Sequence, residues 1–169
     1  HAPDAIDPVL ATQRTLPRPA GFDDDPRPFA VLTINGRDVP ALIDTGSYDA
    51  LVVPRHLFEP TGAALADPRQ SFGTSGFGSN VRLSRRGTLD SARLGGIELI
   101  GTATHVTPHA GTQYAVVGIP VLRRFRIVYD SRSQRLRLIG PTTVDGAQPN
   151  EAVVQLLEDL GRESQSADE

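Results

Sequence analysis

The chain has 169 residues, of which 38% are hydrophobic; this length suffices for one domain with a core and is short for two. The formal net charge of -3 argues against a general nucleic-acid binder, because neutralising phosphates requires an excess of cations. The absence of cysteine excludes disulfides, thiol catalysis and thiolate metal sites. No apolar run approaches the roughly 18 to 20 residues that a membrane-spanning helix needs, so we expect no membrane segment.

The sequence begins at His1 and contains no methionine, which favours a processed or truncated chain. Removal of a signal peptide or an anchor would explain this start, and we therefore expect an exported, periplasmic protein.

Residues 1–28 are rich in proline and contain an acidic cluster at residues 23–25. Such a composition favours an extended arm or linker over a packed element, so we assign residues 1–28 to a Pro-rich N-terminal extension. Simple disorder is the alternative, and a third interpretation is an arm that covers a cleft and inhibits the protein.

Residues 29–34 are rich in β-formers and end at Asn35-Gly36, a strong hairpin signal because both residues tolerate positive φ. Residues 37–43 then form the returning strand, which ends at Asp44. Residues 50–53 predict another short strand, and Pro54 begins a brief turn or helix to Phe58.

Residues 59–70 have the composition of a loop, and residues 70–80 contain three glycines and two aromatic residues. A Gly-rich hairpin tip with exposed aromatic rings suits a mobile flap over a ligand, for which Gly76, Phe77 and Gly78 are the candidate residues. An ordinary long hairpin loop is the alternative interpretation.

A second hairpin is predicted around Gly95-Gly96, between alternating residues 81–94 and residues 97–100. Residues 102–106 are typical of a strand and residues 107–112 of a loop.

Residues 114–120 repeat the earlier design, since an apolar strand runs into a turn at Gly118. A short helix is expected over residues 121–126, and residues 126–130 and 134–139 form a last hairpin. Residues 141–169 are expected to hold a linker, up to residue 149, and a C-terminal amphipathic helix over residues 151–160. Asn150 would cap this helix and Gly161 would end it.

Residues 41–47 read Ala-Leu-Ile-Asp-Thr-Gly-Ser, so a buried strand delivers the carboxylate of Asp44 to a tight loop. A carboxylate in this context is partly desolvated yet close to backbone donors, which suits catalysis. The alternative is a turn in which the Asp and Thr side chains bond the local backbone.

The segment 41–47, the residues Leu51-Val52-Val53-Pro54 that follow it, the glycines near Phe77 and the segment 114–125 together resemble the retropepsin-like aspartic proteases, in the form found in bacterial relatives with a single Asp-Thr-Gly per chain. The resemblance covers residues 29–140, which we assign to the protease domain. It implies a mostly β, retropepsin-like closed β fold with short helices and one acid-protease lobe per chain. The family often has a polar residue after the second turn, whereas here Ile119 and Pro120 follow Gly118, so no inter-subunit salt bridge is carried over.

The resemblance also implies an aspartic endopeptidase that works as a homodimer on protein or peptide substrates, because a chain with one Asp-Thr-Gly cannot supply both carboxylates of the active site. Asp44 would then be catalytic, and the pair of Asp44 carboxylates would share one proton. Thr45 would lock the two loops across the axis, Gly46 would allow close approach of the substrate, and Ser47 would hydrogen-bond the carboxylate. The second-half loop would consist of Gly118, Ile119 and Pro120.

Other chemistries have weaker support in the sequence. His105 and His109 have a helical metal-ligand spacing, but Pro108 argues against a helix there, so we expect no metal site. Gly73 to Phe77 misses the serine-hydrolase elbow, a phosphate-binding loop would need a lysine that the chain lacks, and we expect no cofactor. Arg85-Arg86 and Arg123-Arg124 are interpreted as solvated faces.

Two interpretations stay open beside the protease. The first is a non-catalytic dimerisation or peptide-binding module that keeps the fold. The second concerns the C-terminal helix, whose apolar stripe favours packing on its own domain over binding a partner.

Overall fold

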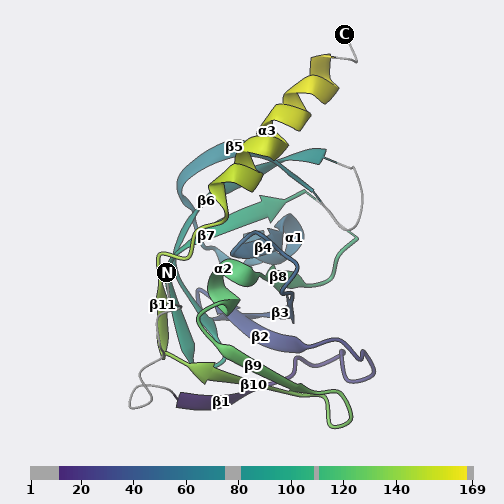
Figure 1. The fold of residues 1–169 in the computed structure, drawn as a ribbon, viewed down its shortest axis with the longest axis vertical. Helices are drawn as coiled ribbons and strands as arrows, with labels where there is room; N and C mark the ends of the chain where they lie inside the picture. Colours follow the sequence, from purple (N-terminus) through teal and green to yellow (C-terminus); the bar gives the residue numbers. More distant parts are fainter. Residues whose placement is uncertain (1–11, 75–80, 109–110, 167–169) are drawn as a thin grey trace.

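The computed structural model describes residues 12–74, 81–108 and 111–166, shown as a ribbon in Figure 1. Among the described residues, strands account for 50% and helices for 16%, and the strands close into a barrel. The expected mostly β, closed fold with short helices is therefore confirmed.

The barrel forms because one eight-stranded sheet bonds back on itself. Its strand order ends in β2, β6 and β5, and β6 also pairs with β7 near the opposite end, which closes a ring. β11 and β5 extend this ring outside its closure. In ring order from β11 to β5 the strands are β11 (Thr143–Asp145), β7 (Ile97–Thr107), β4 (Leu51–Pro54), β8 (Ala115–Val117), β3 (Arg37–Ile43), β2 (Phe29–Ile34), β6 (Val81–Leu94) and β5 (Ala66–Thr74).

A separate three-stranded sheet lies at the lower end of the barrel in Figure 1 and consists of β1 (Thr12–Leu16), β10 (Arg135–Gly140) and β9 (Arg126–Asp130). β1 is antiparallel to β10, with Leu16 opposite Leu136. Both leucines are buried in the hydrophobic core. The sequence analysis did not predict β1, which makes the middle of the N-terminal extension a packed element.

The helices are short except for the last one: α1 (Arg55–Phe58), the 3-10 turn η1 (Glu59–Thr61), α2 (Ile119–Leu122) and α3 (Glu151–Ser166). α3 begins where expected, with the Asn150 side chain accepting a hydrogen bond from the Ala152 N–H, and it continues past Gly161 as it projects from the barrel (Figure 1). Within the described ranges, no helix is both long and apolar enough to cross a membrane.

Several predicted elements are confirmed and others differ. The β2–β3 hairpin turns at Asn35 and Gly36, which have φ of 48° and 77° as the sequence signal requires. The interpretation of residues 59–70 as a loop is wrong from Ala66 onward, because β5 begins there and pairs with β6. The expected linker at residues 141–149 contains β11, which pairs with β7 in parallel.

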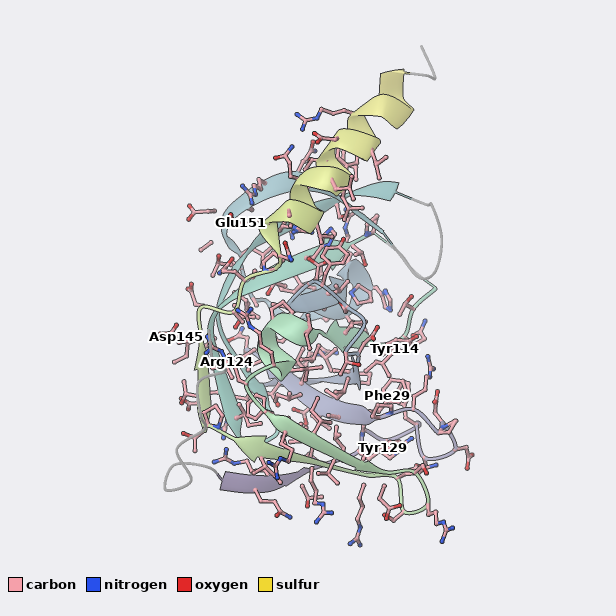
Figure 2. The ribbon with its side chains drawn as sticks, viewed as in Figure 1. Phe29, Tyr114, Arg124, Tyr129, Asp145 and Glu151 are labelled. Carbon is pink, nitrogen blue, oxygen red and sulfur yellow. The ribbon has the colours of Figure 1, made fainter. Side chains whose placement is uncertain are left out.

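An arginine and three aromatic rings hold residues 22–28 against the barrel. The guanidinium carbon of Arg27 lies 5.1 Å from the Tyr114 ring centre and 5.2 Å from that of Phe29. Phe22 packs on Phe29 at 4.4 Å, and Figure 2 shows Phe29 and Tyr114 on one side of the molecule. Arg27 also forms a 2.6 Å ion pair with Asp25. This cluster fixes the chain just before β2, where Pro28 O accepts a hydrogen bond from the Ile43 N–H.

Leu16→Ala tests whether β1 belongs to the folded core. We expect the free energy of unfolding to fall by about 2 to 5 kcal/mol, because a buried leucine leaves a cavity when truncated. The exposed neighbour Thr15 provides the control, since Thr15→Ala removes no buried surface. Equal, small losses in urea unfolding of both variants would show that β1 does not contribute to stability.

The pKa of Asp25 is lowered from 3.8 to about 2, first by hydrogen bonds from the Arg27 side chain and then by the Arg27 backbone N–H. A carboxyl whose pKa is lowered on folding stabilises the protein above its ordinary pKa, so this contribution is lost as the pH falls from 3.8 toward 2. Titration of the Asp25 carboxyl by NMR should show the low value, and Arg27→Gln should return it toward 3.8. An unchanged titration in Arg27→Gln would contradict the ion pair.

Candidate functional site

Asp44 lies directly after the end of β3, at the point where β3 pairs with β8. The two strands run in parallel with Ile43 opposite Val117, and the Asp44 N–H donates to Val117 O at 3.0 Å. The side chain of Asp44 is half-buried. The apolar strand predicted from residues 41–43 thus holds the backbone of Asp44 in place while its carboxylate stays accessible.

The loop after Asp44 folds around its carboxylate. The Gly46 N–H donates to Asp44 Oδ1 at 2.8 Å, and the Ser47 N–H donates to Asp44 O at 3.2 Å. Thr45 and Gly46 are exposed, whereas Ser47 is half-buried. This Asx turn orients the carboxylate and presents the loop apex to solvent. The link from Ser47 to Asp44 seen in the structure runs through the backbone, and the predicted contact from the Ser47 hydroxyl stays a prediction.

The second-half loop lies against the first. The Gly118 N–H donates to Ala50 O at 3.0 Å and the Ile119 N–H donates to Ser47 O at 2.9 Å. A Cβ atom on Gly118 would lie 2.0 Å from Asp49 O, so only glycine allows this approach. The φ of Gly118 is -106°, an ordinary value, and the requirement is therefore one of space. Pro120 is buried, and Ile119 is 39% exposed.

β5 and β6 form the hairpin at whose tip the flap was predicted. The candidate flap residues Gly76, Phe77 and Gly78 lie outside the described residues, so their role stays a prediction. The same holds for His109, which was considered as a metal ligand beside His105.

Two clefts lie near the start of α3, between residues 148–149 and strands β5 and β6. They have volumes of about 550 and 280 Å³, and Arg69, Arg86, Gln148 and Pro149 line both. Asp44 lines neither of them. These clefts therefore do not form a binding site around Asp44.

A buried polar cluster that the sequence analysis did not predict joins the Asp44 loop to β6 and β7. Asp49 Oδ1 lies 3.0 Å from Arg86 Nη2, and Asp49 Oδ2 lies 3.3 Å from His105 Nδ1. His105 Nε2 lies 2.6 Å from Ser84 Oγ. His105 Nδ1 also lies 3.4 Å from Arg86 Nη2. Because the nearer neighbour of Nδ1, the Asp49 carboxylate, can only accept, we assign the Nδ1 proton to His105 and let the Ser84 hydroxyl donate to Nε2.

The solvated interpretation of Arg85-Arg86 is wrong for Arg86, which is 4% exposed, and right for its exposed neighbour Arg85. Ser84 and Arg86 are two residues apart and share one face of β6, and Arg86 is opposite His105 on β7. The available signal was this alternation, because it places Ser84 and Arg86 together on one face of the strand.

The order Ser84, His105, Asp49 matches the hydrogen-bond relay of serine hydrolases, but its burial excludes that chemistry in this structure. Ser84 is 7% exposed and His105 is 2% exposed. A nucleophile must reach the substrate carbonyl, and a hydroxyl on a residue that is only 7% exposed does not offer that access. The cluster therefore calls for an explanation other than serine catalysis.

The part of the chain that holds both loops matches a known protein family. The model of the family described as "gag-polyprotein putative aspartyl protease" matches residues 30–124, more than half of the chain. The match includes both loops at Asp44 and Gly118 and all four residues of the buried cluster. A search of curated proteins finds no match to the sequence.

Gly118→Ala tests the contact between the two loops. A methyl group at this position would overlap the backbone of Asp49, so we expect the free energy of unfolding to fall by about 3 kcal/mol or more. Gly46→Ala is the control, because its Cβ would meet only Asp44 Oδ1, at 3.2 Å. Thermal unfolding of the two variants checks the order, and an equal effect would contradict the close approach at Gly118.

Proposed function

The chain belongs to the family of gag-polyprotein aspartyl proteases, and from this premise we propose that it is an endopeptidase whose active site forms between two copies of the chain. The observation that carries the proposal is the half-buried carboxylate of Asp44, which the Gly46 N–H orients at the exposed end of a strand pair. Family membership supports peptide hydrolysis, and the homodimer and the paired carboxylates are our inference.

The need for a second copy follows from counting carboxylates. Asp-Thr-Gly occurs once in the 169 residues, at Asp44. Two acids with separate tasks are needed for the acid–base hydrolysis of an amide without a metal. A two-fold axis near the exposed Thr45 and Gly46 would bring Asp44 of the partner subunit to the first Asp44.

In the proposed reaction the two carboxyl groups hold one proton between them, because two neighbouring carboxylates do not both ionise readily. The ionised Asp44 takes a proton from a water molecule, whose oxygen bonds to the carbonyl carbon of the peptide. The protonated Asp44 gives its proton to the carbonyl oxygen. The carbon–nitrogen bond then breaks as the amine receives a proton from the first carboxyl group, while a hydroxyl of the intermediate returns its proton to the second and becomes the carbonyl of the new acid.

This shared proton sets the expected pH dependence. The active form carries one proton on the pair, and it is lost when both groups are protonated or both are ionised. We therefore expect a weakly acidic optimum of peptide hydrolysis.

Asp44→Asn tests the catalytic role directly. The amide cannot act as a general base, so we expect kcat/KM on a diverse peptide pool to fall by about 100-fold or more. Asp90→Asn is the control, since Asp90 is an exposed carboxylate on β6. Circular dichroism must show that both variants fold, and hydrolysis that persists in folded Asp44→Asn would contradict the mechanism.

Mixing wild-type and Asp44→Asn chains tests the dimer. After refolding equal amounts together, a site shared by two copies leaves about a quarter of the activity, because only dimers with two wild-type chains work. A site within one chain leaves about half. Sedimentation of the same samples gives the oligomeric state, and a stable monomer without hydrolysis would favour the non-catalytic peptide-binding module.

A further inference from the structure

The loop that carries Asp44 is fixed from two sides. On the side of β8, backbone hydrogen bonds join Asp44 to Val117, Ala50 to Gly118 and Ser47 to Ile119. On the side of β6 and β7, the only described ion-pair partners of Asp49 are Arg86 and His105. Asp49 lies five residues after Asp44, so the side chain of Asp49 ties the far end of the same loop.

Within the buried cluster, the negative charge of Asp49 and the positive charge of Arg86 compensate each other. Asp49 is 6% exposed and Arg86 is 4% exposed, so removing the partner of either residue leaves a largely buried charge with little access to water. Two other nitrogens of Arg86, Nε and Nη1, are buried and have no hydrogen-bond partner among the described residues. Arg86 therefore relies on Asp49 for its charge compensation, and loss of this carboxylate would drive Arg86, or the loop, to move.

The cluster also connects the loop to the strand that leads from the predicted flap. Ser84 and Arg86 belong to β6, which follows residues 75–80, and His105 belongs to β7. His105 is placed between Asp49 and Ser84, with its two ring nitrogens facing one each. Because the imidazole is planar, both contacts fix the same ring orientation, and the position of Asp49 is coupled to that of β6.

We propose that Asp49, Arg86, His105 and Ser84 are positioning residues, which set the place of the Asp44 loop relative to β6 and thereby align the carboxylate of Asp44. This inference rests on the proposed function, because alignment matters only if Asp44 reacts. Catalytic groups must be held within about 0.5 Å of the productive geometry, and a misplacement of about 1 Å lowers rates by about 100-fold. None of the four side chains needs to touch the substrate for this role.

A role in stability alone makes a different prediction. Such a cluster would lower the melting temperature when broken, and the protein that remains folded would react at the normal rate. Positioning instead lowers kcat in the folded protein, with a smaller change in KM.

The experiment compares Asp49→Asn, Arg86→Gln and the double variant with the control Arg85→Gln, which alters the exposed neighbour on the same strand. We expect each single variant to lower kcat by about 10- to 100-fold with KM changed by less than about 3-fold. The double variant leaves no unpaired buried charge, and we expect it to recover at least about 10-fold in kcat over either single variant. Arg85→Gln should keep the wild-type kcat.

Ser84→Ala tests the same inference if a charge variant does not fold. It removes only the hydroxyl that faces His105 Nε2 and alters no charge. We expect kcat to fall by about 3- to 10-fold with the charges intact. The inference would be overturned if all four folded variants, Ser84→Ala, the two single charge variants and the double variant, kept the wild-type kcat.

Amide hydrogen exchange separates this inference from the proposed function. The Gly46 and Ser47 N–H groups donate to Asp44 and report the loop without any reaction. We expect their exchange to be at least about 10-fold faster in Arg86→Gln than in Arg85→Gln, at equal stability of the remaining core. Faster exchange in a protein whose wild type hydrolyses no peptide would refute the proposed function and leave the coupling of the loop intact. Unchanged exchange with an active wild type would refute the positioning cluster alone.

Discussion

The parallel pairing of β3 with β8 is the interaction on which the arrangement of the site depends. It sets Ile43 opposite Val117, so the two strands end at the same level and their loops meet. The hydrogen bonds from Asp44 to Val117 and from Ile119 to Ser47 exist only because of this register. A shift by one residue would turn Ile43 out of the core and move the carboxylate away from Gly118.

Two kinds of interaction hold the Asp44 loop, and they respond differently to change. The backbone bonds to β8 are made at a spot where Gly118 leaves no room for a side chain. The ion pair of Asp49 with Arg86 is buried, so it orients the two side chains. The cost of removing both charges from water offsets much of their attraction, and the pair alone therefore contributes little to stability. The first interaction fixes the loop to the barrel, and the second couples it to β6.

Much of the barrel follows from local sequence patterns, because those patterns are also what the tertiary structure uses. Asn35-Gly36 specifies the β2–β3 turn, and the apolar run before Gly118 specifies β8. β1 and β11 were missed because each is a short strand without a periodic pattern, and pairing with β10 or β7 is what makes it a strand. The helix α3 continues past Gly161 because a single glycine weakens a helix by only about 1 kcal/mol.

In the site, too, the features encoded by adjacent residues could be predicted from the sequence, whereas those that depend on tertiary packing could not. Asp44 and its turn are encoded by seven adjacent residues and could be found in the sequence. Arg85 and Arg86 are chemically identical neighbours, and only the packing of β6 decides that Arg86 faces Asp49 while Arg85 meets water. Asp49 itself lies in the predicted loop, but its partners come from residues 84–105, and no spacing in the sequence connects them.

The two ends of the Asp44 loop differ in their exposure to solvent. Its far end is covered, with Asp49 buried by β6 and β7 and in contact with Gly118, whereas Thr45 and Gly46 at the apex are exposed. The two clefts beside α3 do not reach Asp44. A loop whose far end is held by buried contacts and whose apex, Thr45 and Gly46, is exposed is suited to contact a surface from outside the chain. In the dimer that we propose, the second copy would meet the loop at this apex.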